Sequence, residues 1–405
     1  MCLSYKNPRH VYDVLRPLLA FSKLCGQTAF SIVGEPPYVQ IKVTRVEYAT
    51  ILTNFAANLF CVYINISNSQ LSRLTGSTVM DFGLSFLFPM GAIIMIMLAI
   101  DNFLRRDLTC TIIAELFKVD RSLQRKCHKI DHRRHYAILA RVLFVLVIMI
   151  AVGVVFSLGM CLFTDFSLGN HLINSFSYGL TGIQFMIVNF HFVAAARLIT
   201  FRLDAIKHIL RKHSDTGSWW IEQKQRWGRR MDPVDVVVEL ADDFAALVHI
   251  VERVNRIYSN QIIALITGVG MFCIFVIYSS TYSCYYVGST RESHLTVILL
   301  TACVFYVMMV GVTFVAAASV ENTSNEIVGL VHEAMHRVVD SSIKGKLLYF
   351  SLQILFRRPK LRCMFYDYDW KTLFSIFGFV VTYLVILLQF DKFSEDTSKR
   401  NIWTK

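Results

Sequence analysis

The sequence predicts an all-α polytopic membrane protein with seven transmembrane helices. Of its 405 residues, 55% are hydrophobic and 17% are charged, and the mean hydropathy is +0.48. Soluble domains contain about 45–50% apolar and about 25% charged residues. Several uncharged runs reach the roughly 20 apolar residues that cross a bilayer as one helix. Basic residues also alternate between the two sides of these runs.

Each apolar run is expected to form one transmembrane helix. In lipid the backbone must satisfy its own hydrogen bonds, so continuous runs of this length form helices. The segments of a transmembrane β-barrel are shorter and alternate in polarity. The predicted spans are 43–66, 82–101, 137–163, 172–196, 259–287, 293–319 and 372–390.

The placement of lysine and arginine predicts the orientation, because cytoplasmic loops carry an excess of both. Thirty-five of the 41 fall in the amino-terminal segment, at the base of the third span, or in the loops after the second, fourth and sixth spans. We therefore expect a cytoplasmic amino terminus, an extracellular tail at 391–405 and contacts between basic loops and anionic membrane lipid. The net charge of +12 then requires no nucleic-acid partner.

Sequons and cysteines leave two questions open. Asn65 begins a sequon at the outer end of the first span, where the nearby membrane leaves its use undecided. Three cysteines, Cys61, Cys161 and Cys284, fall near helix ends on one predicted side. They either form a disulfide or stay free as small buried residues, and the second interpretation is favoured. Cysteine spacing indicates no metal site.

Other classes of protein fit the sequence less well. A G-protein-coupled receptor has an extracellular amino terminus, which contradicts the charge distribution. A transporter often places charged residues at membrane depth. Here His191 is the main ionisable residue well inside a span, and we interpret it as a core histidine in preference to a functional one. No hydrolase, metalloprotease or phosphate-loop motif occurs, so neither enzymatic activity nor a cofactor is expected.

The basic side is expected to contain further helices. The fourth span continues over 197–213, and Pro233 opens a helix that leads into the fifth span. A third helix is expected from about Glu321 to Phe356. Because an amphipathic helix in water needs a partner, these helices pack on one another, contact another subunit or dock on the membrane surface. The apolar positions are Leu198, Phe201, Ile206 and Leu210, and then Ile327, Leu330, Val331, Ala334, Val338 and Val339.

The last span, KTLFSIFGFVVTYLVILLQF at 371–390, carries one polar stripe. Positions seven apart share a face of an α-helix, which aligns Ser375, Thr382 and Gln389. Such a stripe either packs against helices of its own chain or lines a pore. One helix does not enclose water, so a pore requires copies from several symmetric subunits.

The stretch TYLVILLQF at 382–390 resembles the carboxyl-terminal signature of insect gustatory receptors. In that signature Thr-Tyr is followed by five mostly apolar residues and Gln-Phe, which Thr382, Tyr383, Gln389 and Phe390 match. The preceding residues 351–376 also resemble the family, although its frequent Gly-Phe-Phe run is missing. Length, seven spans and basic loops agree with the family over nearly the whole chain.

The resemblance implies the insect chemoreceptor channel fold and a plasma-membrane, ligand-gated, non-selective cation channel. Four identical or related subunits surround one pore, each contributing its last helix, and a small-molecule tastant opens the pore to permeant cations. The implied regions are a cytoplasmic segment (1–42), a ligand-binding bundle (43–319) with cytoplasmic extensions (197–258), anchor helices (320–371), the pore helix (372–390) and the tail (391–405).

Residue roles follow from the same resemblance. Gln389 and Phe390 belong to the gate region, and Tyr383 is a packing member of the motif. Ser375, Thr382 and Ile386 are candidate pore residues.

The outer halves of the second to sixth spans supply the candidate ligand site. Aromatic side chains with a few polar groups suit a small organic ligand. A sugar, a bitter compound, a lipid-like pheromone and an internal nutrient all remain open, as does a membrane transporter or an orphan seven-helix receptor of another class. The candidates are Tyr278, Tyr282 and Gln184, followed by Thr281, Tyr178, Phe86 and Phe305.

Overall fold

The structure, a computed structural model, describes residues 8, 10–28, 30–33, 40–67, 78–126, 130–163, 168–214, 233–286, 290–363 and 365–403. Its elements are α1 (Val11–Leu24), β1 (Ser31–Val33), β2 (Gln40–Lys42), α2 (Arg45–Ser67), α3 (Thr78–Leu104), α4 (Arg106–Arg125), α5 (His132–Phe163), α6 (Leu168–Ser214), α8 (Pro233–Tyr286), α9 (Thr290–Arg337), α10 (Ser341–Phe356) and α11 (Trp370–Trp403).

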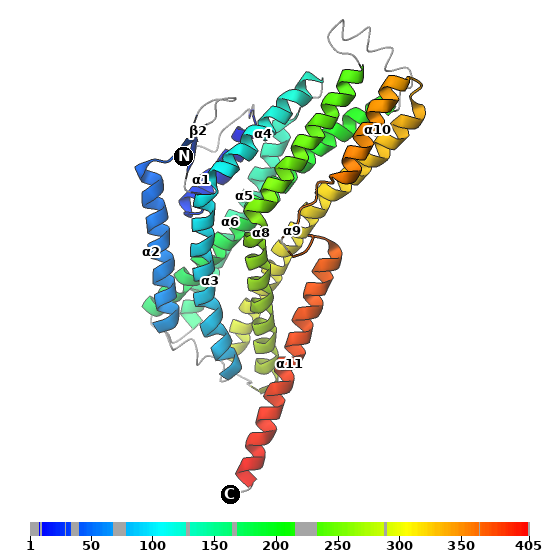
Figure 1. Ribbon diagram of the computed structural model, residues 1–405. Helices are drawn as coiled ribbons and strands as arrows, with labels where there is room; N and C mark the ends of the chain where they lie inside the picture. Colours follow the sequence, from blue (N-terminus) through cyan, green and yellow to red (C-terminus); the bar gives the residue numbers. More distant parts are fainter. Residues whose placement is uncertain are drawn as a thin grey trace.

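The long helices run along the molecule, which divides into two halves (Figure 1). The upper half contains α1, the β1–β2 hairpin, α4 and α10. The lower half contains most of α2 and α3 together with α11, which descends along the edge of the bundle to the carboxyl terminus. We assign the described residues of 8–44, 105–136, 197–258 and 320–369 to the upper half, and those of 45–104, 137–196, 259–319 and 370–403 to the lower half.

The predicted class, an all-α polytopic membrane protein, is confirmed. Six helices of the described part are long and apolar enough to cross a membrane, and they overlap six predicted spans. The remaining span, 137–163, lies within α5, a helix of 32 residues. Strands β1 and β2 form a short antiparallel hairpin, with Ile32 opposite Ile41, that the sequence prediction did not include.

Residues 102–136 are more than the loop that the sequence suggested. They contain α4, whose buried side chains include Ile112, Leu116, Val119 and Leu123. This spacing places them on one face of a helix. The many basic residues lower the average hydropathy of the stretch, so the sequence analysis treated it as a loop and did not detect its apolar face.

The helix expected over Glu321–Phe356 is interrupted. It ends at Arg337, and α10 begins after Asp340, whose Oδ1 accepts a hydrogen bond from the Ser342 N–H at 2.8 Å. Val339 lies in the break and is 98% exposed, so its predicted place on the apolar face was wrong. The other predicted apolar positions on α9, such as Ile327 and Val331, are buried or half-buried.

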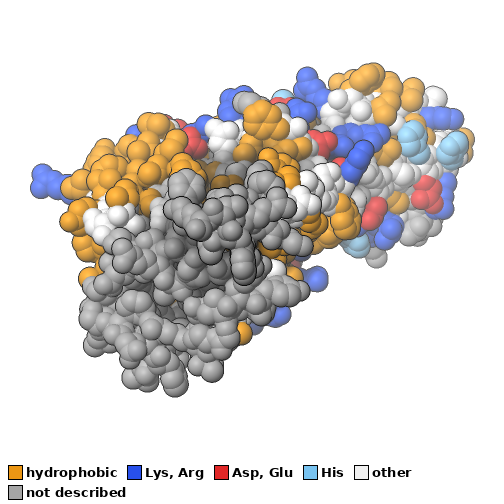
Figure 2. Space-filling model, turned by 90° about the horizontal axis from the view of Figure 1, so that it is seen from below, with side chains coloured by type: hydrophobic (Ala, Val, Ile, Leu, Met, Phe, Trp, Pro, Cys, Tyr) orange, Lys and Arg blue, Asp and Glu red, His pale blue; other side chains and the backbone are white. Residues whose placement is uncertain are grey.

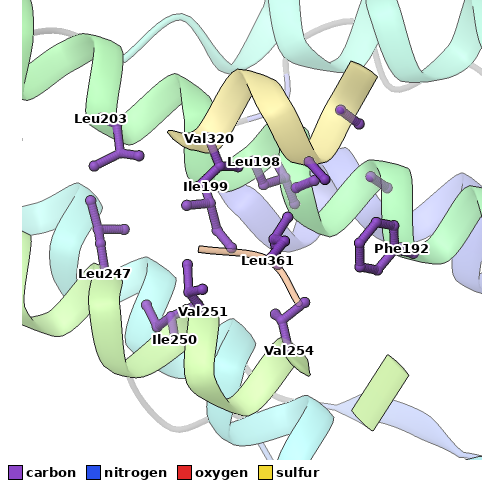
Figure 3. Close-up of a cluster of buried hydrophobic side chains, with 14 of the residues drawn as sticks. Phe192, Leu198, Ile199, Leu203, Leu247, Ile250, Val251, Val254, Val320 and Leu361 are labelled. Atoms are coloured by element: carbon purple, nitrogen blue, oxygen red, sulfur yellow. The ribbon is translucent and has the colours of Figure 1, made fainter. Parts of the chain in front are cut away.

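The centre of the upper half is formed by α6, α8 and α9. Figure 3 shows Phe192, Leu198, Ile199 and Leu203 of α6 opposite side chains of α8. The predicted extension of the fourth span over 197–213 is therefore correct, and it packs within its own chain. In the lower half, α6 and α9 are joined by Asn189, whose Nδ2 donates to the Met309 carbonyl at 2.9 Å.

Ion pairs reinforce the upper half. Arg202 of α6 donates to both carboxylate oxygens of Asp120 of α4, at 2.8 and 2.7 Å, and both side chains are buried. Nζ of the buried Lys126 lies 2.6 Å from Oδ2 of Asp243 on α8. Among the described residues, every ion pair recorded includes a residue of the upper half. Figure 2 accordingly shows charged side chains mostly in the distant part at the right, and hydrophobic ones over the described surface at the left.

Residues 357–369 connect α10 to α11 and are fixed against the bundle. The Asn255 side chain of α8 binds the connection twice, donating to the Lys360 carbonyl at 2.8 Å and accepting from the Arg362 N–H at 3.0 Å. Leu361 between them is buried, and it reaches the side chains of α6 and α8 in Figure 3. The Tyr368 ring packs edge-to-face on Phe192. A shift of this connection therefore requires a shift of α11 or of the helices that hold it.

Candidate pore-lining helix and ligand site

The last helix, α11, begins with a side-chain cap. Oδ1 of Asp369 accepts a hydrogen bond from the Thr372 N–H at 2.8 Å, which satisfies a donor that the first helical turn leaves open. This hydrogen bond stabilises the carboxylate and lowers the pKa of Asp369. The part of the helix that is long and apolar enough to cross a membrane is Trp370–Gln389, close to the predicted span 372–390, and the helix itself continues to Trp403.

One face of α11 contacts the bundle. Leu373 and Val380 are buried, and Ile376 and Leu387 pack partly against the core. These positions recur at helical spacing and form a single stripe. Val380 meets α8 at Gly270, where a Cβ atom would lie 3.8 Å from its methyl group.

The predicted polar stripe lies on the opposite face. Ser375, Thr382 and Gln389 are all exposed, and each is two residues beyond a contacting residue, about 200° around the helix. The Thr382 hydroxyl donates to the Gly378 carbonyl of its own helix at 2.8 Å. Packing of this stripe within its own chain, one of the two open interpretations, therefore does not occur.

Between Phe374 and Ile386, the other exposed side chains of α11 are apolar or aromatic. Ile386 is 37% exposed and Tyr383 is 46% exposed. The Tyr383 ring contacts Phe379 of the same helix, with centroids 4.4 Å apart. The Phe390 side chain lies outside the described residues. Only 11% of the most apolar window of α11 is buried, compared with 61% for α6.

Gln184 lies in a buried polar cluster between α2 and α6. Its Nε2 donates to Oδ1 of Asn54 at 2.5 Å, and Asn58 donates to the same oxygen at 3.0 Å. The remaining side-chain oxygens, Oε1 of Gln184 and Oδ1 of Asn58, have no hydrogen-bond partner among the described residues. The cluster therefore offers two buried acceptors.

The other candidate ligand residues are spread over four helices, α3, α6, α8 and α9. Tyr278 of α8 is fully buried, and the half-buried Thr281 donates to the Ile277 carbonyl of its own helix at 2.9 Å. Phe305 of α9 is half-buried, whereas Phe86 of α3 is 45% exposed. The side chains of Tyr178 and Tyr282 lie outside the described residues.

An aromatic cluster in the lower half was not predicted as such. The Tyr306 ring of α9 packs edge-to-face on Phe185, Phe272 and Phe305, with centroid distances of 5.6 to 5.9 Å. Its hydroxyl lies against Gly182, where a Cβ atom would approach to 2.7 Å, so a larger residue there would displace the Tyr306 hydroxyl. Phe305 alone was selected from the sequence, because single aromatic residues do not reveal which of them converge.

The described residues contain no group of three His, Cys, Asp or Glu side chains placed to hold a metal ion. The described cysteines are free, including Cys61. Cys161 and Cys284 have side chains outside the described residues, so the disulfide question is settled for neither.

Comparison with known proteins places this arrangement of helices in a family. The sequence matches the 7tm chemosensory receptor family over residues 15–394. The protein belongs to this family, and it is a multi-pass membrane protein. The resemblance to insect gustatory receptors is thereby confirmed at the level of the family.

Particular relatives agree with this assignment. Gustatory receptor 28b of Drosophila melanogaster is 22% identical over 98% of this chain and 89% of its own length. The fold matches the insect olfactory receptor OR5 from Machilis hrabei with a TM-score of 0.67, at 11% identity over 93% of this chain and 97% of the receptor. The same receptor in complex with eugenol matches with a TM-score of 0.61.

Proposed function

We propose that this protein is a gustatory receptor and a ligand-gated, non-selective cation channel, in which four copies of α11 line one pore. The observation that carries the proposal is the exposure of Ser375, Thr382 and Gln389 on the face of α11 opposite its own bundle. In lipid, such a stripe gains from a polar partner or from water. Around a four-fold axis, copies of the stripe face a common water path.

A second exposed surface supports assembly. Helix α10 buries Ile343, Leu347, Phe350 and Ile354, yet Leu348, Tyr349, Leu352, Leu355 and Phe356 on its other side are exposed. An exposed contiguous apolar surface of this kind marks a contact with another molecule. We assign the cover to further copies of this chain, or of related receptors, because the pore already requires them around the same axis.

The distribution of charge supports an orientation with the upper half in the cytoplasm. The amino terminus then lies inside the cell, and the carboxyl terminus lies outside the plasma membrane. This places the buried ion pairs of α4, α6 and α8 in the water-facing part of the protein, where the shared anchor of residues 320–371 is expected.

The ligand is a small organic tastant that binds within the lower half of each subunit. The Tyr306 cluster supplies apolar and aromatic walls, and the free acceptors of Gln184 and Asn58 favour a ligand that donates hydrogen bonds. A hydroxylated aromatic or aliphatic compound has both properties. Eugenol, with which the structural relative from Machilis hrabei forms a complex, is the first compound to test.

Opening requires that the ligand binds the open state more tightly than the closed state. A difference of about 1.4 kcal/mol per site changes the ratio of closed to open channels tenfold, and four sites multiply. The α8 and α9 helices bear both candidate ligand residues and the contacts of α11 and its connection. A small displacement of these helices therefore reaches the pore helix directly.

Oocyte expression with a tastant panel tests the function. We expect ligand-evoked cation currents whose reversal potential and block change in Gln389→Glu, because a charge at the stripe alters the pore field. The matched control, Gln353→Glu on α10, leaves the permeability ratios unchanged. Evoked currents that are insensitive to Gln389→Glu would remove α11 from the pore, and saturable substrate uptake without current would favour a transporter.

A further inference from the structure

A cavity of about 70 Å³ lies outside both the pore helix and the candidate ligand site. Its walls come from α1, the turn that follows α1, the end of α3 at Asn102, α4, α6 and α8. On this measure a single water needs about 10–15 Å³, so the cavity holds about five waters or one small organic molecule. His191 in its wall lies two helical turns from Gln184 along α6, a distance of about 10 Å.

Four polar atoms of three cavity-lining residues have no hydrogen-bond partner among the described residues. They are Nε2 and Oε1 of Gln27, Nδ2 of Asn102 and Nε2 of His191. Gln27 is only 1% exposed. Buried polar groups are almost always paired, and leaving them unpaired is costly. Their convergence on one cavity indicates that something with hydrogen-bonding capacity occupies it.

The side chains are held in place from outside the cavity. Gln27 follows Gly26, which adopts a φ of 70°, and its backbone N–H donates to the Ser22 carbonyl at 2.9 Å. A Cβ atom at Gly26 would lie 2.4 Å from Cβ of Asn54, so glycine is required at this turn. Oδ1 of Asn102 accepts from Gln261 at 2.7 Å, which leaves its Nδ2 as the free donor.

The remainder of the wall restricts the chemistry of the occupant. None of the described lining residues is Asp, Glu, Lys or Arg. An ion would therefore enter without a countercharge, which is unfavourable in a buried site. Apolar side chains cover the other sides, including Leu15, Leu18, Ile112 and Leu116.

We propose that this cavity is a second binding site, which takes a neutral small molecule with one hydroxyl or carbonyl head group and a short hydrocarbon stem. The head group hydrogen-bonds Gln27, Asn102 and His191, and the stem lies against α1 and α4. This also accounts for the unpaired Nε2 of His191, which packing in the core does not explain. The site involves no residue of α11, so it stands or falls independently of the channel proposal.

Photoaffinity labelling of the purified full-length protein in lipid nanodiscs tests the site. The probe is hexanol carrying a diazirine on its chain, and labelled peptides are mapped by mass spectrometry. We expect label on residues 15–19 or 112–116 that excess hexanol competes away and that excess hexane does not. Competition by hexane to the same extent would mean that the polar side chains do not recognise the head group. The absence of saturable label there would mean that only water fills the cavity. Either result would overturn the proposal.

Two variants remove the site by different means. Gln27→Leu deletes two of the unpaired polar atoms, and Ala195→Leu fills the cavity from α6 without removing a polar group. Each is expected to reduce the saturable label at least tenfold in monodisperse protein, and Ala195→Leu alone decides the matter if Gln27→Leu does not fold. The matched control, Gln353→Leu on α10, should label like wild type. Unchanged labelling of Ala195→Leu contradicts the proposal.

Discussion

Helices α6 and α11 are both apolar enough to cross a membrane, but they occupy opposite positions in the protein. In α6, 61% of the most apolar window is buried, compared with 11% in α11. Three long polar side chains of α6 bind other helices: Gln184 binds Asn54, Asn189 binds the Met309 carbonyl and Arg202 binds Asp120. The Thr181 and Thr200 hydroxyls donate to carbonyls of α6 itself. The described hydroxyl bond of the α11 stripe, from Thr382, stays on its own helix. Hydropathy therefore identifies a transmembrane span. The hydrogen-bond partners of its polar side chains indicate whether the helix is surrounded by its own chain or leaves one face exposed.

The largest effect is expected at Arg202 of α6. Arg202→Leu leaves the buried Asp120 carboxylate without its bidentate partner, which should lower the free energy of unfolding by about 3–5 kcal/mol. Thermal unfolding in nanodiscs measures the change. The double variant Asp120→Leu/Arg202→Leu should recover most of it, because no uncompensated charge remains. A single variant as stable as wild type would mean that α6 does not depend on this pair.

A matched pair of isoleucines compares the two helices directly. Ile199 of α6 is 0% exposed and Ile386 of α11 is 37% exposed. Ile199→Ala should cost about 2–5 kcal/mol because it creates a cavity. Ile386→Ala should change subunit stability by less than about 1 kcal/mol. Thermal unfolding measures both changes. Equal losses of unfolding free energy in the two variants would contradict the difference in burial between α6 and α11.

Acidic pH should destabilise the packing around the upper part of α6. The His135 ring stacks on Phe201 at 3.9 Å, and burial lowers the pKa of His135 to about 3, with Arg202 and His132 adding to the effect. The unfolded chain binds the proton near pH 6.5, so stability is complete above about pH 7 and falls as the pH decreases from 6.5 towards 3.

Between pH 6.5 and 4.5 this histidine alone should cost about 2 kcal/mol. His135→Phe retains the stacking but binds no proton. Its melting temperature should therefore fall less than that of wild type over this pH range. The pH dependence is measured on both proteins under identical conditions. Parallel curves for wild type and His135→Phe would show that His135 is not the titrating group.

The smallest effect is expected at the start of α11. Asp369→Ala removes the cap on the Thr372 N–H and should cost about 1 kcal/mol, whereas Asp369→Asn retains an acceptor and should cost less. Hydrogen exchange of the first turn of α11 reports the change locally. Faster exchange in Asp369→Ala alone is the expected result, and equal exchange rates in both variants would exclude a capping role.

The sequence predicted the spans well because hydropathy and charge act over long windows. It also identified the extension of α6 and the start of α8 at Pro233, since a helical period and a helix-initiating proline are local signals. Helix α4 was missed because basic residues on its other face lower the average hydropathy of the stretch, although its apolar residues share one face. The break at residues 338–340 was missed because the apolar period continues through it as far as Val339.

Functional residues were harder to predict than helices. The stripe of Ser375, Thr382 and Gln389 follows from helical spacing alone, and its exposure required the structure. The unpaired atoms of Gln27 and Asn102 depend on contacts between segments far apart in the chain, which no single-sequence pattern contains. His191 was noticed as an ionisable group within a span, but the cavity beside it was not visible in the sequence.

Cross-linking between subunits at Thr382 tests the central claim, that the polar face of α11 meets copies of itself. Thr382→Cys and the matched Val380→Cys, which lies on the face that contacts the bundle, are treated in intact membranes with a short bis-maleimide. Wild-type protein gives the background from native cysteines. The account predicts strong covalent dimers for Thr382→Cys and background levels for Val380→Cys. Equal, background-level cross-linking of both variants would contradict it.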